Sequence, residues 1–233
     1  MGEILSIASA MLTRAEARVE ASGTNVVNAN TPGYRRRVDF ATIVGNGTTS
    51  TQHVQEQHVH EFSPGKYQIS EKPLDLAIEG EGFFVVSDGA SLFYTRNGGF
   101  HREQGRLINA QGYALQAAEG GDVQVGDGEL GFAGDATVLR DGAPAGRVAI
   151  VDFEDRAILK SEDGGLFSAQ SGAGTAVDRP VLRQGMLEGS NVSVGDEMVR
   201  MMEAMRGAET GQRLVQTYDD LMGRALNAFG GNG

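Results

Sequence analysis

The feature that most constrains the fold of this sequence is a pair of long amphipathic helical patterns, one at each end of the chain. Almost nothing between them has a helical period. Residues 4–29 and residues 194–229 place apolar side chains three and four positions apart, and charged side chains fill the opposite faces. An apolar helix stripe has to be buried, either against the other end of the chain or against neighbouring copies. The pattern therefore indicates assembly more than catalysis.

The second pattern would form a helix of roughly 50 Å. A helical pattern well beyond 25 residues favours coiled-coil-like packing. We predict an α+β fold: a mainly antiparallel β central domain flanked by long N- and C-terminal helices that pair into a coiled-coil-like assembly domain. The alternative is an intramolecular hairpin of two helices that caps a core. The predicted interface residues are Ile4, Ile7, Met11, Val19 and Val26 in the first helix, and Met198, Met201, Met205, Val215, Leu221 and Met222 in the second.

The middle of the chain is predicted to be β-rich. Short β-prone runs such as residues 83–86, 92–95 and 148–151 alternate with Gly-containing turn signals, which is typical of an antiparallel domain, sandwich-like or barrel-like. Residues 41–65 lack convincing periodicity, and we expect a long, partly extended connector there. The predicted organisation is an N-terminal assembly helix at 1–30, an extended connector at 31–69, a β-rich central domain at 70–189 and a C-terminal assembly helix at 190–233.

Composition narrows the classes of partner. The net charge of −11 disfavours binding to nucleic acid or anionic lipid. The chain has no cysteine, so disulfides, thiolate metal sites and cysteine nucleophiles are excluded. No apolar run approaches 18 residues, so we expect no membrane insertion, and the N-terminus lacks the pattern of a cleaved signal peptide.

No motif indicates catalysis, a cofactor or a metal. His58 and His60 are separated by one residue in a predicted loop, but no third ligand stands at a defined spacing. Gly80 and Gly82 lack the third glycine of a dinucleotide-binding turn and precede a β run instead of a helix. We predict solvated histidines and a tight turn, no catalytic residues and no cofactor.

Gly207 and Gly211 form a G-x-x-x-G pattern inside the second helix, and each lowers helix propensity by roughly 1 kcal/mol relative to Ala. Two interpretations stay open. The glycines allow close approach of a second helix in an assembly, or the helix frays or bends there until it is packed.

Three separated motifs, in order and with sensible spacing, carry a resemblance to a known family. Residues 25–34 end the first helix, residues 72–86 open the β region, and residues 184–192 lead into the second helix. They resemble bacterial flagellar rod and hook proteins. The family-motif residues are Asn25, Asn28, Thr31, Gly33, Tyr34, Gly80, Gly82, Phe83, Ser190, Asn191 and Val192.

The resemblance implies a non-enzymatic structural subunit of the flagellar basal-body rod, which polymerises through its terminal helices and transmits torque across the periplasm. The chain length fits the FlgF and FlgG type. We favour the proximal rod (FlgF), and the distal rod (FlgG) is the alternative. Implied partners are copies of itself, other rod and hook subunits, and the type III export apparatus. From a different class, a cell-wall carbohydrate-binding or carbohydrate-acting β-protein is the alternative, although aromatics are only 6% and Trp is absent.

Overall fold

The chain folds as two compact units. The computed structural model describes residues 2–44, 53–170 and 173–230, with the side chains of residues 6–38, 59–170, 173–224 and 227. A helical unit comprises Met1–Val27, Arg37–Glu61 and Ser193–Gly233, and a β unit comprises Asn28–Arg36 and Phe62–Val192. The chain therefore passes from one unit to the other at each of these boundaries.

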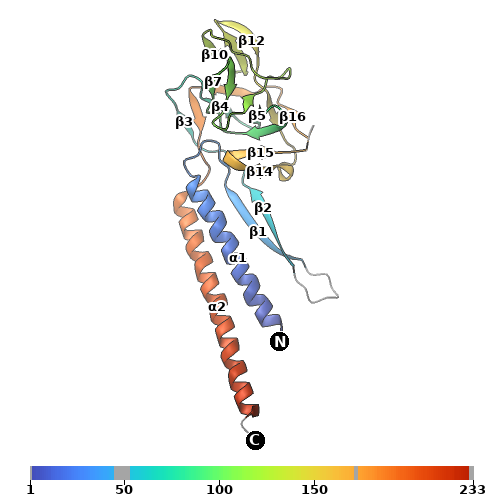
Figure 1. The fold of residues 1–233 in the computed structure, drawn as a ribbon. Coiled ribbons are helices and arrows are strands. Elements are labelled where there is room, and N and C mark those ends of the chain that lie inside the picture. Colours follow the sequence, from blue (N-terminus) through green and yellow to red (C-terminus); the bar gives the residue numbers. More distant parts are fainter. Residues whose placement is uncertain (1, 45–52, 171–172, 231–233) are drawn as a thin grey trace. The chain divides into compact units, whose positions relative to one another are not determined.

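The helical unit contains two long helices, α1 (Gly2–Val27) and α2 (Val194–Gly230), which lie side by side and run antiparallel (Figure 1). Ser193 caps the start of α2, since its Oγ accepts the N–H of Asp196 at 3.4 Å. Asp196 and Glu197 place negative charge in the first turn, where the helix dipole favours it. The end of α1 precedes Pro32, which cannot continue a helix.

The predicted fold class is wrong in its coiled-coil-like assembly domain. Over the described residues the structure has one long α-helix near each end and a mainly β region between them, with no coiled coil. Large apolar side chains form the seam of a coiled coil, but small residues occupy most of the buried positions of these helices. Those residues are Ala8, Ala15, Ala21, Ser22, Ala204 and Gly211, and the other buried positions carry polar Asn25 and Glu197. A Cβ on Gly211 would lie only 3.4 Å from Leu12 Cγ, so the two helices approach closely there.

Residues 37–44 and 53–60 form a pair of strands, a hairpin, where the sequence predicted an extended connector. Strands β1 (Arg37–Val44) and β2 (His53–His60) pair antiparallel from Arg37 opposite His60 to Val44 opposite His53. A lone two-stranded hairpin is marginally stable in water. Strand β1 also contacts α1, so the helical unit supports the hairpin.

The β unit consists of short strands, and all its pairings among the described residues are antiparallel. The main sheet has the order β14-β15-β6-β5-β9-β8-β7, with β13 pairing both β5 and β16. Smaller sheets are β10-β11-β12, β17-β4 and β18-β3. The strands of the main sheet are β5 (Phe83–Ser87), β6 (Leu92–Thr95), β7 (His101–Glu103), β8 (Arg106–Ile108), β9 (Ala114–Leu115), β13 (Ile150–Asp152), β14 (Lys160–Glu162), β15 (Leu166–Ser168) and β16 (Thr175–Ala176). The others are β3 (Tyr67–Ile69), β4 (Leu76–Glu79), β10 (Leu130–Phe132), β11 (Thr137–Arg140), β12 (Ala143–Arg147), β17 (Val181–Gln184) and β18 (Met186–Glu188), and single 3₁₀ turns lie at Arg156–Ile158 and Asp163–Gly165.

Strand β5 organises the core of the β unit, because alternate side chains of a strand point to opposite faces. Phe84 and Val86 lie in the larger hydrophobic cluster, where the ring of Phe84 packs edge-on against Phe100. Phe83 and Val85 lie in a second cluster rich in aromatic rings. Burial on both faces explains why this strand reads as an uninterrupted apolar run.

Candidate assembly site

Asn25, the first family-motif residue, fixes the start of the hairpin within the helical unit. Its Oδ1 accepts the backbone N–H of Arg37 at 2.8 Å, and its Nδ2 donates to the Arg37 carbonyl at 2.8 Å. Asn25 is fully buried. The side chain therefore bonds the first residue of β1 in the way that a neighbouring strand would.

The next motif residues, Asn28 to Tyr34, belong to the β unit. The hydroxyl of Thr31 donates to Asn28 Oδ1 at 3.1 Å, and its N–H donates to the Asn28 carbonyl at 3.1 Å, which closes a turn after α1. Gly33 has a φ of +69°, and a Cβ there would overlap Asn97 N and lie 2.7 Å from Asn97 Cα. Only glycine fits this position without strain.

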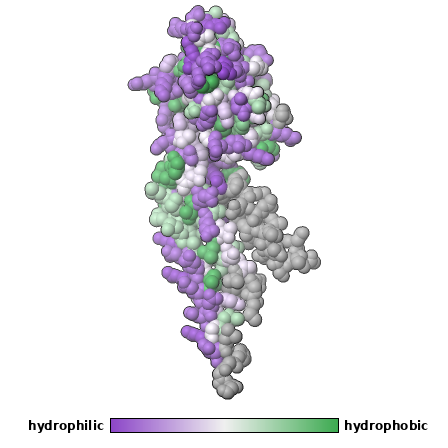
Figure 2. All heavy atoms as spheres, viewed as in Figure 1, coloured by the Kyte–Doolittle hydropathy of each residue, from purple (hydrophilic) through white to green (hydrophobic). Residues whose placement is uncertain are grey.

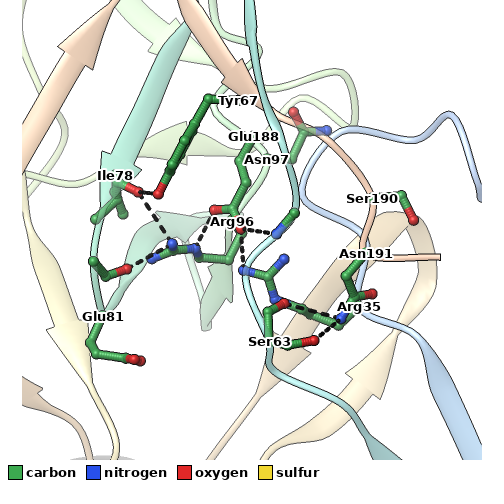
Figure 3. Close-up of polar contacts among 12 residues, drawn as sticks. Arg35, Ser63, Tyr67, Ile78, Glu81, Arg96, Asn97, Glu188, Ser190 and Asn191 are labelled. Atoms are coloured by element: carbon green, nitrogen blue, oxygen red, sulfur yellow. Dashed lines mark hydrogen bonds and ion pairs between the residues drawn. The ribbon is translucent and has the colours of Figure 1, made fainter. Parts of the chain in front are cut away.

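Glu188 lies at the centre of a buried ionic network (Figure 3). One carboxylate oxygen accepts Arg35 Nη2 at 2.6 Å and the N–H of Gly65 at 2.9 Å. The other accepts Arg96 Nε at 2.7 Å. Both guanidinium groups are buried with the carboxylate, so charge-assisted bonds join parts of the chain that are far apart in sequence.

Arg96 extends the network to the second family motif. Its guanidinium donates to the carbonyl of Ile78 at 3.2 Å (Figure 3). It also donates to the carbonyls of Gly82 at 2.5 Å and Gly80 at 2.8 Å. Gly82 has a φ of +113°, and a Cβ there would lie 2.8 Å from Ile150 Cγ2. Gly80 also has a positive φ, with open space around it. These glycines thus turn the backbone so that its carbonyls meet the arginine, directly before buried Phe83 of β5.

The third motif completes the site. Asn191 accepts the N–H of Arg36 on Oδ1 at 2.7 Å and donates from Nδ2 to the Ser63 carbonyl at 3.1 Å. Ser190 Oγ accepts the N–H of Val192 at 3.2 Å, which shapes the turn before α2. All three motifs therefore meet within the β unit, with Asn25 alone in the helical unit.

The three charged residues of this network were not predicted from the sequence. Burial lowers the pKa of the Arg35 guanidinium, and the neighbouring Glu188 carboxylate partly offsets that effect. Arg35 stands in a run of three arginines directly after the first motif region, Arg96 follows the second by ten residues, and Glu188 stands inside the third, so a search for charges in and near the motifs could have found them.

The predicted interface stripe has both exposed and half-buried members. Along the start of α2, five large apolar side chains are 39–55% exposed, and we call them the apolar face of α2. Figure 2 shows apolar atoms gathered along the first turns of that helix. The apolar face consists of Val194, Met198, Val199, Met202 and Met205.

The other predicted stripe residues lie outside this face. Ile7 and Leu221 are exposed, at 50% and 60%. The half-buried members are Met11, Val19, Val26, Met201, Val215 and Met222. The side chain of Ile4 is outside the described residues. The role of the stripe in assembly stays a prediction.

A cavity of about 160 Å³ lies beside the ionic network. Arg35, Arg96 and Arg156 contribute to its lining together with aromatic rings. Its one lining carboxylate, Glu81, is paired with Arg156. This lining does not supply the pair of convergent carboxylates that glycoside hydrolysis requires.

No group of three or more potential metal ligands occurs among the side chains that the structure describes. The side chain of His58 is outside them. No helix in the described part of the chain is long and apolar enough to span a membrane.

Comparison with known proteins identifies the family. A family model described as "Flagellar hook protein FlgE/F/G D1 domain" matches residues 77–143, and one described as "Flagellar basal body rod FlgEFG protein C-terminal" matches residues 183–228. The flagellar basal-body rod protein FlgF of Salmonella typhimurium is 31% identical over 226 residues, covering 88% of this chain and 89% of the relative. The chain belongs to the flagellar basal-body rod protein family. FlgG of Bacillus subtilis is 27% identical over 251 residues (91% of this chain, 93% of the relative), and FlgG of Borreliella burgdorferi is 28% identical over 278 residues (97% and 98%).

Both matched regions of this rod-family chain contribute to the site. The D1 match contains Arg96, Gly80 and Gly82, and the C-terminal match contains Glu188, Asn191 and the apolar face of α2. Arg35 comes before both matched regions. The ionic network therefore joins the two family regions to a segment near the start of the chain.

Proposed function

We propose that this chain is a structural subunit that polymerises into the flagellar basal-body rod through the apolar face of α2. The observation that carries the proposal is this face, on which Met198, Met202 and Met205 are each more than half exposed. A contiguous apolar surface on a soluble unit marks an interaction site. Methionine adapts its shape to different neighbours, which suits a lattice of non-identical contacts.

The partners follow from this role. Copies of the same chain and other rod or hook subunits would cover the apolar face, and the assembled rod would transmit torque across the periplasm. We propose delivery by the flagellar type III export apparatus. We assign the chain a structural role and no catalytic one, in line with a family of rod proteins.

Within the family, the FlgF type is the better fit. The alignments to the two FlgG relatives run over 251 and 278 residues, more than the 233 of this chain, so both contain insertions relative to it. The alignment to FlgF runs over 226 residues. We therefore propose a proximal-rod subunit, with the distal rod as the alternative.

A single substitution in the apolar face tests the assembly role. Met202→Asp places a charge where a neighbour would bury an apolar side chain, so the variant should fail to restore swimming to a strain that lacks the natural gene and should be missing from purified basal bodies. The half-exposed side chain has room for the change in the free subunit, so circular dichroism should match the wild type.

Two controls separate assembly from folding. Met202→Leu keeps the surface apolar and should restore swimming. Leu92→Asp makes a similar change at an exposed apolar residue of the β unit, 49% exposed, and should also swim. Normal swimming and normal rod incorporation of Met202→Asp would refute the assignment of this face.

A further inference from the structure

Three methionine side chains are exposed on one face of α2. Met198, Met202 and Met205 are 53%, 53% and 55% exposed. Spacings of four and then three residues place them on one side of the helix. They share the apolar face of α2 with Val194 and Val199. An oxidant in the solvent can therefore reach all three thioether sulfurs in the free subunit.

The other methionines whose side chains the structure describes are more enclosed. Met11, Met186, Met201 and Met222 are half-buried. Met201 is the most informative of them, because it directly precedes Met202 in the same helix but leaves the helix axis about 100° away from it. These two neighbours share a local sequence and a backbone conformation, and they differ in the exposed fraction of their side chains.

We propose that Met198, Met202 and Met205 form an oxidation site, and that conversion of their thioethers to sulfoxides prevents the free subunit from assembling. The oxidant is a peroxide. One peroxide oxygen bonds to the thioether sulfur as the O–O bond breaks, the sulfur is oxidised by two electrons, and the other oxygen leaves as water. Methionine sulfoxide reductases reverse this product, so the modification is not a permanent loss.

A sulfoxide makes the apolar face polar. Its S=O dipole requires a hydrogen-bond donor, and a neighbour that buries an apolar surface supplies none. An unpaired polar group weakens such a contact by roughly 10- to 100-fold. The block on assembly rests on the proposed function, in which a neighbour covers this face. The reactivity of the three sulfurs in the free chain does not depend on it.

Peroxide treatment of the folded full chain, followed by mass spectrometry, tests the reactivity. Cleavage after arginine gives one peptide of residues 184–200 and another of residues 201–206. Each contains one half-buried methionine beside exposed ones, Met186 in the first and Met201 in the second, so fragment masses compare them within one peptide.

The exposed methionines should gain oxygen first, and Met202 should react faster than Met201. In urea-unfolded chain the two should react alike, which is the control for local sequence. Equal rates at Met201 and Met202 in the folded chain would overturn the proposal.

A variant that carries Met198→Leu, Met202→Leu and Met205→Leu tests the block on assembly. Leucine conserves volume and apolar character, so the variant should fold and assemble, but it has no sulfur to oxidise at this face. The matched control carries Met186→Leu, Met201→Leu and Met222→Leu, which removes the same number of half-buried methionines.

Each variant is expressed from an inducible gene, in a strain that lacks the natural one, during a pulse of peroxide. The dose is set so that cells with completed flagella keep swimming. The variant without the exposed methionines should regain swimming, whereas the wild type and the matched control should not. Equal recovery, or equal loss, in the two variants would overturn the proposal.

Failure of this inference differs from failure of the proposed function. If Met202→Asp is excluded from rods while oxidised wild-type subunits enter them, the apolar face is an interface and the oxidation claim is wrong. If Met202→Asp enters rods and swims, the assignment of the face itself is wrong.

Discussion

Gly33→Ala should destabilise the β unit strongly, and the structure gives the size of the effect. An alanine at a φ of +69° costs about 1–2 kcal/mol in backbone strain. Its Cβ would also overlap Asn97 N and lie 2.7 Å from Asn97 Cα, and backbone cannot yield as a flexible side chain does. Forcing an atom into filled space typically costs about 1–3 kcal/mol more. We expect a total loss of about 2–5 kcal/mol in the free energy of unfolding.

Urea unfolding followed by tyrosine fluorescence measures this loss. Four of the five tyrosines lie in the β unit, and the chain has no tryptophan, so the signal reports mainly on that unit. With a urea dependence of about 1–3 kcal/mol per molar, the midpoint should fall by about 1–2 M. Gly142→Ala is the control, since Gly142 has a φ of +79° and no atom within 4 Å of its Cβ position. The control should lose only the strain, about 1–2 kcal/mol.

Equal losses in the two variants would refute the reasoning, because the contact between Gly33 and Asn97 would then contribute nothing. The same would follow if the midpoint of Gly33→Ala matched the wild type. A difference of about 1–3 kcal/mol between Gly33→Ala and Gly142→Ala isolates the steric contribution of the close approach of Gly33 to Asn97.

Three further changes test other parts of the structure. Gly207 has no atom within 4 Å of its Cβ position, so Gly207→Ala should stabilise the helical unit by about 1 kcal/mol, measured by thermal unfolding with circular dichroism. Asn25→Ala leaves the backbone N–H and C=O of Arg37 without their side-chain partner and should destabilise the start of β1 by about 1–3 kcal/mol, seen as faster amide exchange at Arg37. A hydrogen bond from Gln116 lowers the pKa of Asp122 below its ordinary value, so the stability that this carboxylate contributes is present above about pH 4 and is lost as pH falls through the folded pKa. Asp122→Asn should lose less stability than the wild type between neutral pH and about pH 2.5, measured by urea midpoints.

The β region could be predicted from the sequence because its signals are local. The run at residues 83–86 is apolar and bounded by glycine and by Asp88-Gly89, and it forms β5. Residues 92–95 form β6, which pairs with β5 through the turn that Asp88 Oδ1 stabilises by accepting the N–H of Ser91 at 2.7 Å. Apolar runs and turn residues therefore predict both a strand and the strand that pairs with it.

The pairing of β1 with β2 and the buried charged residues could not be predicted in this way. Strand β2 is mostly polar, so no apolar alternation marks it, and its pairing with β1 depends on support from α1. A lone glutamate or arginine in a sequence is most often exposed. Glu188 is buried because Arg35 and Arg96 approach from 153 and 92 residues away, a relation that no local pattern contains.

The failed coiled-coil prediction shows which property of the helices the apolar period leaves out. Period alone identifies which side chains share a stripe, but side-chain size decides which part of the stripe lies against another helix. In α2, Ala204 and Gly211 are buried, and Gly211 lies close to Leu12 of α1. Small residues let two backbones approach and leave the longer side chains beside the contact, so Met202 and Met205 remain exposed. The features that make this helix pair unlike a coiled coil therefore also leave α2 with an apolar surface that a neighbouring subunit can cover.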